Sequence, residues 1–88
     1  MKIIQKVKVK NALGLHTRPA TVIVKLLQDS KSSVQMTYKR DTINAKSIMS
    51  ILMLAVHKNG NITITVDGED ADDTMGRLVT AFESRFGE

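Results

Sequence analysis

A histidine and an arginine, His16 and Arg18, lie two positions apart just before an apolar stretch with helical spacing. A neutral imidazole is a competent nucleophile toward phosphorus, and a guanidinium carries a fixed fork of donors that matches phosphate oxygens. The backbone N–H groups in the first turn of a helix attract anions at the same place. Together these features predict a site suited to reversible transfer of a phosphoryl group onto His16.

The same residues also allow a purely structural interpretation. A histidine in front of a helix can simply cap it, and an arginine in a first turn can point into solvent. No set of metal ligands and no glycine-rich nucleotide-binding loop accompanies His16. We therefore expect no metal and no cofactor, and a phosphoryl donor would have to bring its own phosphate.

The hydrophobic pattern predicts seven elements in the order β-α-β-β-α-β-α. Alternating residues predict strands over 3–9, 34–38, 42–45 and 62–66. Helical spacing predicts helices over 17–28 and 47–57 and a third helix that begins at Asp70. Short strands with one polar face favour an α+β fold, in which a four-stranded antiparallel sheet carries three helices on one face.

The first and the last of the predicted helices show further signals of where they begin and which side faces the core. Pro19 falls in the first turn of the helix over 17–28, where its missing N–H costs little. Asp70 is expected to cap the last helix. The apolar stripe of that helix is expected to pack into the core, and it consists of Met75, Leu78, Val79, Phe82 and Phe86.

The length and composition restrict the class of protein. The chain has 88 residues, which predicts a single domain over 1–88. It contains no cysteine and shows no targeting segment, and its longest apolar run, 51–56, is too short to cross a bilayer, so we expect a cytoplasmic protein without membrane insertion. The net charge of +4 fits either an ordinary solvated surface or a surface for acidic partners, and an aromatic content of only 3% disfavours nucleic acid.

The helix predicted over 47–57 is unusually apolar. Ser47 is expected to be its N-cap. One stripe is expected to face the core (Ile48, Ile51, Leu52 and Ala55), and further apolar side chains surround the rest of the helix (Met49, Met53, Leu54 and Val56). An exposed apolar patch is a candidate contact surface, although small proteins also expose some apolar side chains without a partner.

Two blocks of this sequence resemble motifs of one family. The run from Gly14 to Ala20 resembles the phosphorylation-site signature of HPr, the histidine-containing phosphocarrier family of the bacterial phosphoenolpyruvate-dependent phosphotransferase system. The block from Ala45 to Met49 resembles the regulatory serine motif of that family. Length, element order and the spacing of the blocks agree with the resemblance, but Ser50 and Ala55 stand where many members have glycine, and the turn over 39–41 lacks the usual glycine.

The resemblance implies an open-faced β-sandwich and a phosphocarrier that is not itself an enzyme. It implies that enzyme I phosphorylates His16 at Nδ1, and that the phosphoryl group then passes to A domains of sugar permeases. It implies that Arg18 and the backbone N–H of Thr17 stabilise the phosphate.

Regulation and docking are also implied by the resemblance. Ser47 matches the site of regulatory phosphorylation, and a serine kinase/phosphorylase and a transcription regulator are implied as further partners. Partner docking is implied for Ile48, Met49 and Leu52.

Two other functions remain open from the sequence. One is a regulatory binding module, in the nitrogen branch or docked on a transcription factor or an enzyme, in which phosphotransfer is secondary. The other is an anion- or nucleic-acid-binding α/β domain, which the scarcity of aromatic residues disfavours.

Overall fold

A computed structural model describes residues 1–88 and shows four strands and three helices in the predicted order. The elements are β1 (Lys2–Lys8), α1 (Thr17–Leu27), β2 (Ser33–Tyr38), β3 (Asp41–Asn44), α2 (Ile48–Leu54), β4 (Asn61–Asp67) and α3 (Ala71–Glu83), followed by a short 3₁₀ turn over Arg85–Gly87. The α+β class and the element order are therefore confirmed.

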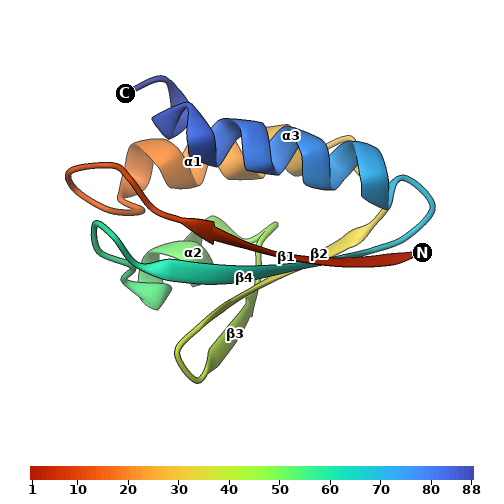
Figure 1. Cartoon of the computed structure of the whole chain (residues 1–88), viewed down its shortest axis with the longest axis horizontal. Coiled ribbons are helices and arrows are strands. Elements are labelled where there is room, and N and C mark those ends of the chain that lie inside the picture. Colours follow the sequence, from red (N-terminus) through yellow and green to blue (C-terminus); the bar gives the residue numbers. More distant parts are fainter.

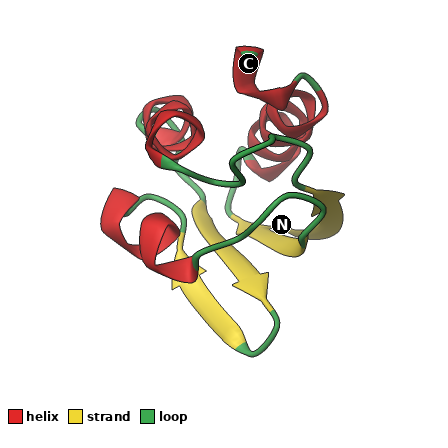
Figure 2. Cartoon of the chain, turned by 90° about the vertical axis from the view of Figure 1, so that its left-hand side faces the viewer, coloured by secondary structure: helices red, strands yellow, loops and turns green.

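The four strands form one antiparallel sheet in the order β1-β4-β2-β3. Helices α1 and α3 lie side by side over one face of this sheet (Figure 1). The third helix, α2, packs against α1 and β3, and Figure 2 shows it lower than the other two and to one side of the strands. The sheet and the helices thus form the open-faced sandwich that was expected.

The core lies between the sheet and the helices. The alternation in the strands places every second side chain inward, so that Val34 pairs with Val66 and Met36 pairs with Ile64, all four buried. The helices complete a core of 19 buried apolar residues. None of the helices has the length and apolar composition that a membrane crossing requires.

Helix α2 is shorter than the sequence pattern predicted. It ends at Leu54 because Ala55 adopts a left-handed conformation, with φ 54° and ψ 47°, and its N–H bonds to the carbonyl of Leu52. The chain leaves the helix there, so Leu54 and Val56 are buried while Ala55 is exposed, the reverse of the expected distribution. His57 consequently lies beyond the helix rather than near its last turn.

The left-handed conformation at Ala55 is one that favours glycine. Ala55 occupies a position where many proteins with the resembling motif have glycine, and only glycine adopts this conformation without a steric cost from Cβ. Lys39, in the turn between β2 and β3, likewise has a positive φ of 56°. At these two positions the chain therefore accepts a left-handed backbone conformation without glycine.

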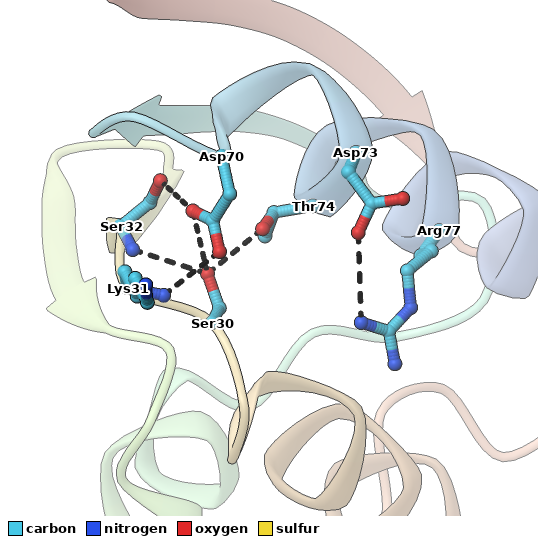
Figure 3. Close-up of polar contacts among 7 residues, drawn as sticks. All are labelled: Ser30, Lys31, Ser32, Asp70, Asp73, Thr74 and Arg77. Carbon is cyan, nitrogen blue, oxygen red and sulfur yellow. Dashed lines mark hydrogen bonds and ion pairs between the residues drawn. The ribbon is translucent and has the colours of Figure 1, made fainter.

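Asp70 occupies the N-cap position of α3, but the prediction that its side chain caps the helix is wrong, because it makes no capping hydrogen bond. The carboxylate instead accepts hydrogen bonds from the Ser32 hydroxyl, from the Lys31 amide at 2.9 Å and from the Ser30 hydroxyl (Figure 3). Ser30 also bonds to the hydroxyl of Thr74 at 2.8 Å. This network ties the turn after α1 to the start of α3.

The end of α3 differs from the predicted continuous stripe. The α-helix stops at Glu83, and Arg85 and Phe86 both have φ near 55°. Phe86 still reaches the core, where its ring lies edge-on to Phe82 with 4.8 Å between the centroids. Its burial thus comes from a sharp left-handed turn and not from helical spacing, and the same turn brings Glu88 back over the body of the protein.

Candidate functional site

His16 occupies the N-cap position of α1. Its backbone is extended, with φ −75° and ψ −171°, and its carbonyl accepts the first helical hydrogen bond from the Ala20 amide at 3.1 Å. The imidazole makes no capping hydrogen bond, and 30% of the side chain is exposed. The ring is therefore available for chemistry, and the interpretation of His16 as a side-chain cap is excluded.

The first turn of α1 supplies two free backbone donors next to this ring. Ala20 already bonds to the His16 carbonyl, and Pro19 has no N–H, so the amides of Thr17 and Arg18 are those without an intrahelical acceptor. The first turn contains no acidic side chain that would compete for them. This end of α1 therefore favours an added negative charge.

A short loop holds His16 in place. The Leu15 amide bonds to the Val56 carbonyl at 3.0 Å, and the Gly14 amide bonds to the Asn11 carbonyl at 3.0 Å. Leu15 is buried. The loop is thus fixed to the segment that directly follows α2, which couples the position of His16 to the end of that helix.

The C-terminal residue, Glu88, places a carboxylate next to His16, a contact that no sequence pattern predicted. His16 Nε2 lies 2.9 Å and 3.1 Å from the two carboxylate oxygens of Glu88. Asn11, itself buried, donates from Nδ2 to Glu88 at 2.5 Å and to the Arg85 carbonyl at 2.8 Å. Glu88 is 72 positions from His16, and no local pattern marks either it or Asn11 as part of a site.

The electrostatics around Glu88 favour its ionised form. Burial raises the pKa of the Glu88 carboxyl, but hydrogen bonds from His16 and Asn11, together with the charges of His16 and Arg18, outweigh that effect and leave the pKa lowered. Glu88 is therefore a carboxylate near neutral pH and an acceptor for the Nε2–H of His16.

Basic side chains surround the same place. An open depression of about 480 Å³ lies beside His16, and it is lined by Lys10, Lys58 and Arg85 as well as by Asn11 and Glu88. Arg18 is exposed at the start of α1. With four cations and one carboxylate near it, the imidazole stands in surroundings that suit a dianionic group or an acidic partner.

The residues predicted for regulation and docking lie on α2 or at its start, and not in the loop that carries His16. The Ser47 hydroxyl accepts a hydrogen bond from the Ser50 amide at 3.3 Å, which confirms Ser47 as the N-cap. Ile48 and Leu52 are half-buried against the core, whereas Met49 is 62% exposed. Of the three residues predicted for docking, only Met49 is thus largely exposed.

The exposed part of α2 includes one methionine that the docking set did not contain. Met53 is 78% exposed and lies four positions after Met49, so both side chains lie on one face of the helix. Although α1 and α2 pack together, Ser47 makes no hydrogen bond with the residues around His16. The predicted regulatory serine is therefore not part of the hydrogen-bonded surroundings of His16.

The chemistry of the site follows from these positions. An accessible imidazole and two unpaired amides meet at the start of α1, and Arg18, exposed in the same turn, adds a positive charge, an arrangement that can accept and release a phosphoryl group. No three His, Cys, Asp or Glu side chains are grouped so that they could hold a metal ion.

Comparison with known families agrees with this geometry. The family model described as "PTS HPr component phosphorylation site" matches residues 3–84. This chain belongs to the HPr family. It is 49% identical to the phosphocarrier protein HPr of Chlamydia pneumoniae over 80 residues, which cover 91% of this chain and 74% of that protein.

Solved HPr structures share the fold. The crystal structure of HPr-C-His from Thermoanaerobacter tengcongensis superposes with a TM-score of 0.94 at 32% identity, covering 98% of this chain and 97% of the other. The HPr of Bacillus anthracis str. Ames gives a TM-score of 0.87, also at 32% identity, covering 92% and 96% of the two chains. The resemblance seen in the two sequence motifs thus extends to the whole fold.

Proposed function

We propose that residues 1–88 form one cytoplasmic phosphocarrier domain that accepts a phosphoryl group on Nδ1 of His16. The donor is phosphorylated enzyme I, which obtains the group from phosphoenolpyruvate, and the acceptors are A domains of sugar permeases. One observation carries this proposal: the His16 ring stands at the N-cap position of α1 without capping it, in front of two amides that have no helical partner.

The transfer needs only groups that this site contains. The lone pair of Nδ1 forms a bond to phosphorus as the bond between phosphorus and the donor breaks and the donor keeps that electron pair. The negative charge that arrives is stabilised by the N–H groups of Thr17 and Arg18 and by the Arg18 guanidinium. The reverse steps discharge the group to the next protein.

We further propose that α2 is part of the docking surface. The exposed Met49 and the half-buried Ile48 and Leu52 offer apolar contacts, and methionine adapts to several partners. The net charge of +4 favours acidic partners.

Ser47 offers a route to regulation of that surface. We propose that a serine kinase phosphorylates it, which would add nearly two negative charges at the edge of the docking surface and weaken binding to acidic partners. A kinase, the matching phosphorylase and a transcription regulator are the additional partners on this account.

A two-step assay tests the proposed relay. The protein is incubated with phosphoenolpyruvate and catalytic enzyme I, and its intact mass is measured before and after an A domain of a sugar permease is added. The proposal expects a gain of one phosphoryl group in the first step and its loss in the second. A chain that gains no phosphoryl group would instead favour the regulatory binding module.

A further inference from the structure

Only one of the two ring nitrogens of a neutral histidine can act as a nucleophile. The nitrogen that carries the proton has no available lone pair, so attack from Nδ1 requires the tautomer with its proton on Nε2. In proteins, the hydrogen bond made by one ring nitrogen selects the tautomer and orients the ring. A partner at Nε2 therefore decides whether Nδ1 of His16 can react.

Glu88 is placed to be that partner. Its carboxylate oxygens lie 2.9 Å and 3.1 Å from Nε2, within hydrogen-bond distance. A carboxylate can only accept, so the hydrogen bond requires the proton to be on Nε2. Both side chains are partly exposed, with exposed fractions of 30% for His16 and 22% for Glu88.

The carboxylate is held from two sides. Asn11 is 2% exposed and donates from Nδ2 both to Glu88, at 2.5 Å, and to the Arg85 carbonyl, at 2.8 Å. The backbone before Glu88 turns sharply, since Arg85, Phe86 and Gly87 all have positive φ values. Two of these are not glycine, and such conformations persist only where surrounding contacts determine them.

We propose that Glu88 is a positioning residue for phosphotransfer, which holds His16 as the Nε2–H tautomer and leaves the Nδ1 lone pair free. This proposal rests on the proposed function of His16. When Nδ1 forms its bond to phosphorus, the proton stays on Nε2 and the ring gains positive charge, which the carboxylate stabilises. The phosphoryl group and Glu88 then lie on different ring nitrogens, so the carboxylate does not occupy the position of attack.

The test combines tautomer and rate measurements on the whole chain. Nitrogen-15 NMR of the imidazole reports which ring nitrogen carries the proton, and rapid-quench assays with enzyme I report the rate of phosphorylation. The variants are Glu88→Ala, which removes the acceptor, and Glu88→Gln, which keeps an oxygen acceptor without the charge. Glu83→Gln, at an exposed position of α3, is the matched control.

The wild-type protein is expected to show the Nε2–H tautomer in its neutral state. Glu88→Ala should increase the fraction with the proton on Nδ1 and slow phosphorylation about two- to fivefold, the range expected for one partly exposed charged pair. Glu88→Gln should largely keep the tautomer but lose part of the rate, and Glu83→Gln should change neither.

Two results separate the proposal from the function on which it rests. An unchanged tautomer and an unchanged rate in Glu88→Ala, with wild-type His16 accepting phosphate, would overturn the role of Glu88. A wild-type chain that accepts no phosphate would overturn the proposed function instead, whereas a tautomer shift in Glu88→Ala would still support the pairing of Glu88 with His16.

Discussion

Gly14 lies directly against the carbonyl group of Val56, in a left-handed conformation with φ +67°. A Cβ at position 14 would overlap that carbonyl oxygen, and the next residue, Leu15, donates its amide to the same oxygen at 3.0 Å. The close approach of these two backbones helps to fix the loop that presents His16, together with the buried side chain of Leu15.

Gly14→Ala is therefore expected to destabilise the fold by about 2–4 kcal/mol, because the new methyl group meets backbone and the conformation disfavours a side chain. Gly76→Ala is the matched control, since it lies within α3 with open space around a new Cβ. That substitution should stabilise the protein by about 0.5–1 kcal/mol. Urea unfolding of both variants checks this, and equal effects would show that the approach of Gly14 to Val56 is unimportant.

Arg18→Ala should leave stability unchanged, because the side chain is exposed, but should slow phosphotransfer. Loss of one charge-assisted contact in the transferring state is expected to cost roughly 1.5–3 kcal/mol, or about 10- to 150-fold in rate. Arg77→Ala removes an arginine whose only ion pair is with Asp73, within α3, and serves as the control. Rapid-quench rates that match the wild type would show that Arg18 is not needed.

Asp70 predicts how stability depends on pH. Hydrogen bonds from Ser32 and from the Lys31 amide lower the pKa of Asp70 from 3.8 to about 2. A lowered pKa in the folded state means that the contribution is complete above the unfolded value near 4 and is lost as the pH falls toward 2.

Asp70→Asn should consequently be less stable than the wild type at neutral pH, and the difference should shrink between pH 4 and pH 2. Asp72→Asn is the matched control, because Asp72 is an exposed aspartate in the same first turn. Thermal unfolding across this pH range measures both. A constant difference between the wild type and Asp70→Asn would contradict the role of the hydrogen-bonded carboxylate.

Ser47→Asp is expected to stay folded while it binds enzyme I more weakly. Aspartate is a good N-cap, so it can replace the Ser47 hydroxyl that accepts from the Ser50 amide. Its charge lies close to the exposed Met49, at the surface that we propose for docking of acidic partners. The control is Thr80→Asp, at an exposed position of α3.

Calorimetric titration with enzyme I, with melts on the same samples, measures this effect. Equal affinities for a folded Ser47→Asp and the wild type would show that α2 is not the docking surface. An unfolded Ser47→Asp would show that aspartate cannot replace serine as the cap of α2, and Met49→Ala would then test docking without a change at the cap.

The sequence predicts those parts of the fold that follow from periodicity. Val34 and Met36, and likewise Ile62 and Ile64, alternate with polar residues. This pattern predicts two central strands, and the burial of all four apolar residues confirms it. The Ser47 cap is also predictable from the sequence, because the serine hydroxyl bonds to an amide only three positions away. Both patterns involve residues close together in the sequence, so they can be interpreted without knowledge of the tertiary structure.

Other features depend on contacts between distant parts of the chain. The apolar pattern predicted a helix as far as residue 57, because apolar residues continue beyond Leu54. The left-handed conformation of Ala55 ends α2, and the alanine itself gives no signal of that conformation. The Asp70 carboxylate bonds across to Ser32, 38 positions away, in place of its own helix.

The candidate site shows the same division. His16 and Arg18 lie in one local motif and were identified from it, whereas Glu88 reaches His16 only through the turn after α3, which has no signal in the sequence. The predicted docking residues came from the family resemblance, which named Met49 but not Met53, and only the structure shows that Met53 is also exposed.

The central claim is that His16 alone accepts the phosphoryl group, and site-resolved phosphorylation tests it most directly. Wild type, His16→Ala and His57→Ala are each incubated with phosphoenolpyruvate and enzyme I, and acid-labile phosphate is located by peptide mass spectrometry. His57 is the only other histidine and is exposed beyond α2, so it controls for adventitious modification. The account predicts phosphate on His16 in wild type and His57→Ala and none on a folded His16→Ala; phosphate on His57 or undiminished labelling of His16→Ala would contradict it.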